Sequence, residues 1–291
     1  MTAAVEGGAG AGAADMVLYE RRVGLAPAGG ATAPASRAVA LITFNRVDKR
    51  NAWSVPMYRE VVRLVEQANA DPEVGAMVIT NNGTVYSAGA DFKAPPEPKD
   101  PVTGRSPNVG GVAMAQDTSW LHLLARSKPN IIAVNGAAIG LGTTQLLGAD
   151  MRICGESATF SFPFLKLGVM PELGCSALLP RIVGFGRALD LCLRSSKIDA
   201  AEAFRIGLVT QVVPDAELVN VAVELAAVMA QYPAMQVRLT KGMFYANATE
   251  SDMNKMLAVE SKAFIEMMRG LKAANSSADR PSDNFPRGGK R

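Results

Sequence analysis

Two loops rich in glycine and alanine contain the residue types with the clearest chemical potential. The first is Tyr86-Ser-Ala-Gly-Ala-Asp-Phe-Lys93, and the second is Asn135-Gly-Ala-Ala-Ile-Gly-Leu-Gly142. Small residues let a ligand approach the main chain closely, and free N–H groups at a helix start favour developing negative charge. Two such N–H groups converging on one oxygen would form an oxyanion hole. On composition alone, tight turns are the simpler interpretation of both loops.

Residue counts exclude several other kinds of site. His122 is the only histidine, so a zinc site of the HExxH type is excluded. Cys154, Cys175 and Cys192 are odd in number and lack CxxC spacing, which favours a reduced, cytoplasmic setting over a disulfide framework. The segment Gly140-Leu-Gly142 lacks the third glycine and the later acidic residue of a dinucleotide-binding fingerprint.

The composition is that of an enzyme-sized globular chain. Its 291 residues are 48% hydrophobic and can form one large domain or two ordinary ones. The formal charge of +3, from 30 basic and 27 acidic residues, is too small for a dedicated nucleic-acid binder. No signal peptide is expected, and no apolar run reaches the roughly 18 residues of a membrane span. We therefore expect a soluble cytoplasmic protein without a nucleic-acid or membrane partner.

Alternating strands and helices are predicted to position the two loops. Apolar runs predict strands at Ala38–Phe44, Ala76–Thr80, Ile131–Val134 and Met151–Cys154. A helix is predicted after the first strand, with Ser54 as its cap. Its apolar positions are Met57, Val61, Leu64, Val65 and Ala68. This order of elements favours an α/β core with mainly parallel strands.

Beyond about Ala200 the periodicity predicts mainly helices. The expected helices are Ala200–Gly207, Ala216–Gln231 and Glu250–Gly270. The last one carries an apolar stripe typical of a core or a subunit interface. Residues 1–15, 26–36 and 273–291 contain too few apolar residues to offset the entropy of ordering, so we predict that they are loose.

Seven segments in order resemble the crotonase superfamily, the family of enoyl-CoA hydratases and isomerases. Each segment alone is weak evidence, but the series at family spacing is specific. The matching segments are Phe44–Ala52, Ser87–Asp91, Lys128–Gly136, Ala149–Asp150, Phe160–Pro163, Leu179–Gly184 and Ala201–Val209. The resemblance covers about Ala38 to Gly270 and favours a binding role for both small-residue loops over simple turns.

The resemblance implies an α/β crotonase (ClpP-like) spiral of repeated ββα units with a C-terminal helical region. Residues 1–37 would form a flexible segment with a lead-in strand, and 38–200 the spiral core. Residues 201–270 would form a helical trimerisation region and 271–291 a flexible tail. Members of the family assemble as trimers or pairs of trimers, so we expect a homotrimer or a dimer of trimers.

The resemblance also implies an acyl-CoA site. The thioester oxygen would be held by the main-chain N–H groups of Ala90 and Leu141, next to Gly140. CoA would lie along Arg50 to Ala52 and along Ala88, Asp91, Phe92 and Lys93, with Lys49 and Lys93 as candidates for its phosphates. CoA is part of the substrate, and no separate cofactor is expected.

The chain departs from the hydratase pattern at both catalytic positions. The two glutamates that hold and activate water in hydratases correspond here to Thr144 and Phe164, and neither is an acid or a base. However, Pro171-Glu-Leu-Gly-Cys-Ser176 is similar to the Δ3,Δ2-enoyl-CoA isomerases, whose single catalytic glutamate matches Glu172. Dienoyl-CoA isomerases and chlorobenzoyl-CoA dehalogenases carry an aspartate there.

Three functions remain open. The resemblance favours an isomerase in which Glu172 moves a proton while Ala90 and Leu141 hold the enolate. An apolar wall of Phe164, Met170 and Leu173 would raise the pKa of its carboxyl. The alternatives are a hydratase with an atypical base and a non-catalytic acyl-CoA binder, in which Glu172 would cap a helix or lie in solvent.

Four other polar residues are interpreted as structural. Asp91 and Asp150 match family positions that mostly form loops and turns, although Asp91 also lies along the expected CoA segment. His122 lies in an apolar helical stretch. Cys175 has no neighbour in sequence that would lower its pKa, so a nucleophilic role is disfavoured.

Overall fold

The computed structural model describes residues 15–23, 37–94 and 120–276. These residues form two compact units. The first ends at Tyr232 and contains both sheets, and the second begins at Pro233 and contains two helices. Among the described residues, no single helix is long and apolar enough to cross a membrane; residues 215–230 and 234–247 meet that test only when taken together.

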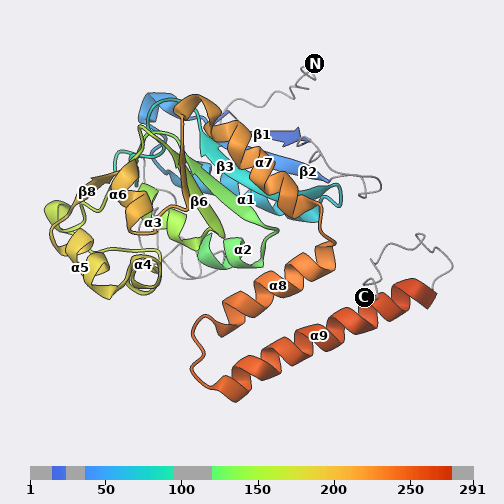
Figure 1. Cartoon of the computed structure of the whole chain (residues 1–291). Coiled ribbons are helices and arrows are strands. Elements are labelled where there is room, and N and C mark those ends of the chain that lie inside the picture. Colours follow the sequence, from blue (N-terminus) through green and yellow to red (C-terminus); the bar gives the residue numbers. More distant parts are fainter. Residues whose placement is uncertain (1–14, 24–36, 95–119, 277–291) are drawn as a thin grey trace, which may run out of the picture. The chain divides into compact units, whose positions relative to one another are not determined.

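A six-stranded sheet forms the centre of the first unit (Figure 1). Its strands lie in the order β1-β2-β3-β4-β6-β9. All neighbouring pairs are parallel except β1 and β2. The strands are β1 (Val17–Arg22), β2 (Ala38–Phe44), β3 (Val74–Asn81), β4 (Asn130–Val134), β6 (Met151–Gly155) and β9 (Gln211–Val213). The predicted α/β core with mainly parallel strands is therefore present.

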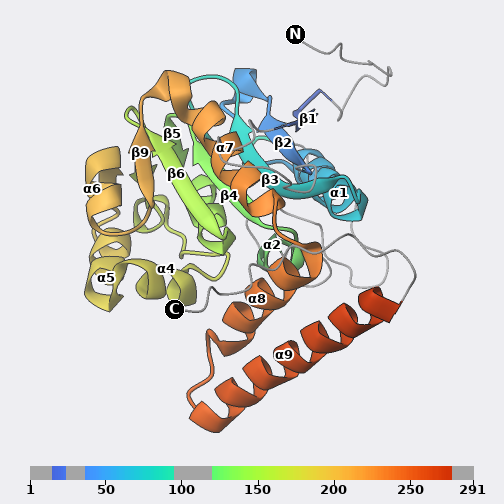
Figure 2. The ribbon, with the colours of Figure 1, turned by 45° about the vertical axis from the view of Figure 1, so that its right-hand side comes forward.

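The central strands are buried on both faces, which explains their uninterrupted apolar sequences. Every residue of β3 is buried, and successive residues contribute to different hydrophobic clusters. Ala76 and Val78 pack with α7 (Leu218–Ala230), whereas Met77 and Ile79 lie in the cluster of the opposite face. This alternation follows from the two-residue period of a strand. Figures 1 and 2 show α7 lying across its face of the sheet.

Helix α1 (Val55–Ala70) forms as its sequence predicts. The Ser54 hydroxyl accepts a hydrogen bond from the Met57 N–H at 3.4 Å, and Pro56 lies in the first turn, where no N–H is needed. The buried residues are the five predicted: Met57, Val61, Leu64, Val65 and Ala68. A short helix, α2 (Trp120–Arg126), buries Trp120 against the same cluster.

A second, smaller sheet lies beside short helices. It contains β5 (Ala137–Ile139), β7 (Thr159–Ser161) and β8 (Lys197–Asp199), with β7 in the middle. Besides α1, α2 and α7, the described part of the first unit contains the helical elements η1 (Val47–Lys49), α3 (Leu141–Thr144), η3 (Gln145–Gly148), η4 (Leu165–Leu167), α4 (Cys175–Val183), α5 (Phe185–Leu193), α6 (Ala200–Arg205) and η5 (Asp215–Glu217). Strand β5 leads into α3 through Gly140, which makes this region relevant to the site.

The second unit consists of α8 (Ala234–Asn247) and α9 (Met253–Ser276). Helix α9 begins three residues later than predicted, because Asp252 accepts hydrogen bonds from the N–H groups of Asn254 and Lys255. It also continues past Gly270, where the sequence predicts its end. Helix α8 is not among the helices predicted from the sequence. This helix has no buried residue, and its sequence lacks a clear apolar stripe.

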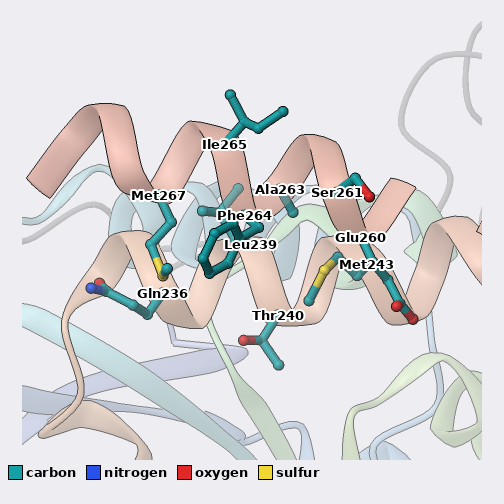
Figure 3. A pocket seen from close by; sticks show the side chains of 10 residues that line it. All are labelled: Gln236, Leu239, Thr240, Met243, Glu260, Ser261, Ala263, Phe264, Ile265 and Met267. Carbon is teal, nitrogen blue, oxygen red and sulfur yellow. The ribbon is translucent and has the colours of Figure 1, made fainter. Parts of the chain in front are cut away.

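A mostly apolar cavity of about 550 Å³ lies between α8 and α9 (Figure 3). Leu239, Met243, Phe264 and Met267 are among the apolar residues that line it, and Glu260 also lines it. None of the residues predicted for catalysis or CoA binding lines it. The apolar stripe predicted for the last helix is thus divided between this cavity and exposed positions such as Leu257 and Met268.

Candidate active site

The two small-residue loops lie side by side in the first unit. The Ser87 N–H donates to the Ala137 carbonyl at 3.1 Å, and the Ile139 N–H donates to the Ser87 carbonyl at 3.0 Å. These bonds form a parallel bridge between Ser87 and Ala138. The first loop is therefore attached to β5, the strand that leads into the second.

The N–H of Ala90 points away from the neighbouring segment that contains Trp53. The Gly89 carbonyl accepts a hydrogen bond from the Trp53 N–H at 2.8 Å, and the Asp91 N–H donates to the Trp53 carbonyl at 2.8 Å. In this parallel bridge Gly89 and Asp91 make the hydrogen bonds to Trp53. The N–H and carbonyl of Ala90, which lies between them, therefore point away from Trp53. Within the described part of the chain, the Ala90 N–H has no acceptor.

The N–H of Leu141 lies at the start of α3 and has no acceptor among the described residues. The Gly140 carbonyl accepts from the Thr143 N–H at 2.8 Å and the Thr144 N–H at 3.0 Å, which closes the first turn. Because a trans peptide holds its N–H opposite its carbonyl, the Leu141 N–H points out of the helix start. Gly140 has φ 55° and ψ −117°, a conformation available essentially to glycine.

The two free N–H groups belong to adjacent segments. A methyl group placed on Gly89 would lie 3.6 Å from the Leu141 nitrogen and 2.7 Å from the Ile139 carbonyl oxygen. Gly89 has φ 93°, so both its conformation and its surroundings require glycine. The structure therefore places the two donors predicted from the sequence, Ala90 and Leu141, in adjacent segments. Their binding of one oxygen atom stays a prediction.

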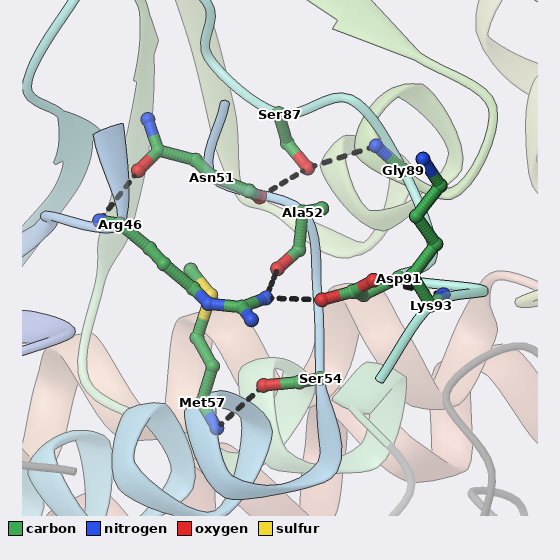
Figure 4. A network of polar contacts seen from close by, with 9 residues as sticks. All are labelled: Arg46, Asn51, Ala52, Ser54, Met57, Ser87, Gly89, Asp91 and Lys93. Carbon is green, nitrogen blue, oxygen red and sulfur yellow. Dashed lines mark hydrogen bonds and ion pairs between the residues drawn. The ribbon is translucent and has the colours of Figure 1, made fainter. Parts of the chain in front are cut away.

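An ion pair fixes the far end of the first loop (Figure 4). The Arg46 guanidinium donates to the Asp91 carboxylate at 2.6 Å and to the Ala52 carbonyl at 2.9 Å. Partial burial pushes the pKa of Asp91 upward, but the Arg46 hydrogen bond, the Lys93 N–H and the Arg46 charge together hold it below its usual range. Asp91 therefore has a structural partner, in agreement with its interpretation as a structural residue.

The residues predicted along CoA surround this network. Lys49, Arg50, Phe92 and Lys93 are exposed. Ala52 and Ala88 are half-buried, and the Ala88 N–H donates to the Arg50 carbonyl at 2.9 Å. The 49–52 segment and the 88–93 segment are therefore adjacent, although they are nearly 40 residues apart in sequence.

Asn51 is a site residue whose role the sequence does not predict. It is buried at φ 51°, next to Arg50 at φ 52°. Its side-chain amide donates to the Asn82 and Val85 carbonyls, and its amide oxygen accepts from the Arg46 N–H at 2.8 Å. These bonds hold a left-handed turn that a non-glycine residue adopts only with support. Asn51 thus fixes the segment that precedes Trp53.

Glu172 is half-buried, and its carboxylate has no hydrogen bond or ion pair to any described residue. Burial raises its pKa to about 7. It does not cap α4, which begins at Cys175 after Gly174 without a side-chain cap. The next residue, Leu173, has φ 51°, a strained conformation of a kind that clusters at functional sites.

Leu121 connects the Glu172 segment to the helix that follows Gly140. A methyl group on Gly174 would lie 2.7 Å from Leu121 Cδ1, and one on Gly148 would lie 2.7 Å from Leu121 Cδ2. Gly148 ends η3, which continues directly from α3. The carboxylate therefore comes from a segment packed through Leu121 against the same helical region that presents the Leu141 N–H.

The predicted apolar wall around Glu172 is partly wrong. Phe164 is buried, but Met170 is 80% exposed and cannot shield a carboxylate from water in this chain. Leu173 is half-buried and packs against the core. The residues before Met170 form η4 (Leu165–Leu167) and an exposed turn, and this turn carries the Met170 side chain on the surface.

The two positions that match hydratase glutamates are not suited to activating water. Thr144 is completely buried, and its hydroxyl is directed toward the Gly140 and Leu141 carbonyls of its own helix, at 3.5 and 3.3 Å. Phe164 is a buried core residue. Neither side chain offers a proton acceptor.

The remaining polar residues have structural surroundings. Asp150 and Asn130 exchange hydrogen bonds of 3.0 and 3.1 Å, each from a main-chain N–H to the other side chain. His122 is exposed on α2. A hydrogen bond to Cys192, together with burial, raises the pKa of the Cys175 thiol, which makes it a poor nucleophile. Within the described ranges, no three His, Cys, Asp or Glu side chains are grouped to hold a metal ion.

Comparison with known proteins identifies relatives along most of the chain. The profile of the family described as enoyl-CoA hydratase/isomerase matches residues 34–278. The short-chain-enoyl-CoA hydratase of Clostridium acetobutylicum is 34% identical over 229 residues, which cover 78% of this chain and 85% of the relative. The 1,2-epoxyphenylacetyl-CoA isomerase of Escherichia coli K12 is 34% identical over 206 residues, covering 70% and 78%.

A solved structure with bound ligand also matches. It is a Thermobifida fusca protein assigned to the enoyl-CoA hydratases, in complex with CoA. The TM-score is 0.68 at 32% identity, and the match covers 81% of this chain and 91% of the other. The match supports the fold expected from the sequence, and it associates that fold with a CoA ligand in the relative.

Proposed function

Because the chain belongs to the enoyl-CoA hydratase/isomerase family, we propose that this acyl-CoA enzyme shifts the double bond of a 3-enoyl-CoA to the 2 position. The family includes relatives named as hydratases and as an isomerase, so family membership does not select the reaction. The observation that supports this reaction is the distribution of carboxylates. Glu172 has a raised pKa and no partner among the described residues, whereas Thr144 and Phe164 stand at the positions that match the hydratase glutamates.

The reaction would use one proton acceptor and two main-chain donors. The Glu172 carboxylate removes a proton from C2, next to the thioester. The electron pair of that C–H bond enters a dienolate whose oxygen is held by the Ala90 and Leu141 N–H groups. The same carboxyl group then returns the proton at C4, which leaves the double bond between C2 and C3. No group other than Glu172 has to change its protonation state.

The raised pKa of Glu172 supports both halves of this cycle. A carboxyl group with a pKa near 7 is a stronger base than an ordinary glutamate, yet it is still ionised in part at neutral pH. The main-chain donors complement this role because they bind charge that appears only when the proton has left. Removing one such donor typically costs on the order of 10² to 10³ in rate.

The exposed cations next to the first loop would bind the CoA part of the substrate. Lys49, Arg50 and Lys93 lie in the two adjacent segments described above, and Phe92 exposes an aromatic ring between Asp91 and Lys93. Lysine and arginine bind phosphate groups, and aromatic rings offer a stacking surface for a base. The CoA-bound relative is consistent with this assignment.

The assignment is tested by Glu172→Gln with a 3-enoyl-CoA substrate. We expect turnover to fall by about 10² or more, because general-base catalysis of this kind contributes 10² to 10⁴. Glu156→Gln, at an exposed position in the same unit, is the control and should keep wild-type turnover. Turnover by Glu172→Gln within a few fold of wild type would remove Glu172 from the reaction.

Assays with crotonyl-CoA and binding measurements separate the alternatives. Hydration of crotonyl-CoA faster than isomerisation would favour the hydratase alternative. Tight binding of acyl-CoA by both wild type and Glu172→Gln, with no product from any enoyl-CoA, would favour a non-catalytic binder. Isomerisation by the wild type that disappears in Glu172→Gln would exclude both.

We also propose that the chain functions in the cytoplasm as a homotrimer or a dimer of trimers. The support for assembly is the apolar surface of the second unit, where Phe244, Leu257, Phe264, Ile265 and Met268 are exposed. A helical surface of this kind is typical of a buried contact between subunits. Light scattering of the purified full chain would give its mass, and a monomer at micromolar concentration would contradict the proposal.

A further inference from the structure

We infer that Ser87 is a positioning residue whose hydroxyl sets the direction of the Ala90 N–H toward the thioester oxygen. The inference rests on the proposed function only in assuming that this N–H binds the thioester oxygen of the substrate. Ser87 does not contact the substrate in this account. It acts through the main chain of Gly89.

Ser87 connects three segments of the site. Its hydroxyl donates to the Asn51 carbonyl at 2.9 Å and accepts from the Gly89 N–H at 3.2 Å (Figure 4). Its main chain pairs with Ala137 and Ile139 of β5. Ser87 is completely buried, so none of these polar groups can be replaced by contact with bulk water.

Close packing leaves Ser87 little freedom to move. A methyl group on Gly142 would lie 2.5 Å from the Ser87 carbonyl oxygen, 2.8 Å from its Cβ and 3.0 Å from its Oγ. The first turn of α3 therefore rests directly on Ser87, with no side chain between them. Because α3 presents the Leu141 N–H, this contact sets the separation of the two loops that provide the donors.

The hydroxyl bond holds the peptide group before Gly89, and the Trp53 N–H holds the peptide group after it. Gly89 has φ 93°, a region in which glycine has few steric constraints and could rotate. Its N–H is held by Ser87 and its carbonyl by Trp53, so both sides of Gly89 are fixed. The planar peptide that joins Gly89 to Ala90 then transmits this orientation to the Ala90 N–H.

Loss of the hydroxyl is expected to change turnover more than binding. Without it, the Gly89 N–H and the Asn51 carbonyl are buried without partners, and the Gly89 peptide rotates to find others. The Arg46–Asp91 pair and the exposed cations remain in place, so the CoA segments keep their conformation. A misdirected donor weakens the stabilisation of the enolate more than it weakens ground-state binding, because the negative charge on the oxygen develops only after the proton has left.

The test compares Ser87→Ala with Ser127→Ala. Ser127 is a matched control: it is buried, and its hydroxyl donates to the Leu123 carbonyl at 2.6 Å and accepts from the Asn69 side-chain amide at 3.0 Å. It lies after α2 and contacts neither loop in these bonds. For 3-enoyl-CoA isomerisation we expect Ser87→Ala to lower kcat on the order of tenfold to 10²-fold, with KM changed less than about threefold. Ser127→Ala should retain both constants.

An infrared measurement reports donor direction without any turnover. Hydrogen bonding lowers the stretching frequency of the thioester carbonyl, so bound butyryl-CoA with a ¹³C-labelled carbonyl should show a shift in the wild type and in Ser127→Ala. The shift should shrink in Ser87→Ala. An unchanged shift together with an unchanged kcat in Ser87→Ala would overturn the inference. An equal loss of the infrared shift and of kcat in Ser87→Ala and Ser127→Ala would also overturn the inference, since it would show a general structural effect.

Two further arms keep the experiment decisive. If Ser87→Ala does not fold, Ser87→Cys is tested instead, because a thiol is a weaker donor and acceptor than a hydroxyl. Ser87→Cys should show a smaller infrared shift than the wild type. An unchanged shift in Ser87→Cys would contradict the inference. If the wild type isomerises no 3-enoyl-CoA, the proposed function fails, while the butyryl-CoA shift still decides the role of Ser87.

Discussion

The Trp53 N–H donates a 2.8 Å hydrogen bond to the Gly89 carbonyl, and the next N–H along the chain, that of Ala90, has no acceptor among the residues that the structure describes. Trp53 lies just before α1, and Gly89 lies in the first loop. Their pairing directs the Ala90 N–H away from the Trp53 segment. A main-chain donor in this protein is therefore created by the pairing of its neighbours.

Replacing Gly89 by alanine should remove the oxyanion donor geometry. The new methyl group would lie 2.7 Å from the Ile139 carbonyl oxygen, and φ 93° is strained for alanine. We expect a stability loss of about 2 kcal/mol and a fall in kcat of at least about 10². Chemical denaturation and steady-state kinetics measure the two effects.

Gly186→Ala is the control for this substitution. Gly186 lies in the first turn of α5, has open space around its Cα and has no positive φ. Activity should be unchanged, and stability should rise by up to about 0.5 kcal/mol because alanine favours a helix. If Gly89→Ala behaved like Gly186→Ala, the Gly89 peptide would have no part in the site.

Thr144→Val should leave turnover nearly unchanged. The substitution keeps the side-chain shape and removes only a hydroxyl that is directed at the carbonyls of its own helix. We expect kcat and KM for a 3-enoyl-CoA to stay within about threefold of wild type. A loss of 10² or more would show that the hydroxyl takes part in catalysis and would revive a water-activating role for the position.

The rate of isomerisation should depend on pH through Glu172. Burial raises the pKa of Glu172 to about 7, and a general base acts only when ionised. In the free enzyme kcat/KM should therefore fall about tenfold per pH unit below about 7 and level off above it. A profile that is flat from pH 5 to 8, measured where the protein remains folded, would argue against Glu172 as the base.

The stability of Glu172→Gln should also depend on pH, with a defined sign. Because the pKa of Glu172 is higher in the folded than in the unfolded chain, ionisation costs folding free energy as pH rises from about 4.5 to about 7. The full shift corresponds to at most about 3 kcal/mol, and partial exposure lowers this cost to about 1 kcal/mol. Glu172→Gln should therefore melt higher than wild type at pH 8 and show no such difference near pH 4.5. Equal melting temperatures at pH 8 would contradict the raised pKa.

Local sequence pattern predicted the parts of the fold that depend on local physics. The apolar positions of α1 and its Ser54 cap appear directly in the sequence, because helix geometry places residues three and four apart on one face. Met170 shows the limit of this reasoning. It is apolar and close to Glu172 in sequence, but the turn that carries it leaves it exposed.

The single histidine in the sequence already excludes proton chemistry that depends on paired histidines, and the small-residue loops already mark Gly140 and Gly89 as places of close main-chain approach. The resemblance of the sequence to one family also pointed to Glu172, Ala90 and Leu141. The direction of each donor, the pairing of Asp91 with Arg46 and the bridging position of Ser87 become visible only in the folded chain. These features depend on hydrogen bonds between residues about 36 to 50 positions apart, such as Ser87 with Asn51 and with Ala137. Local propensity does not encode such contacts, because they form only when separate segments pack together.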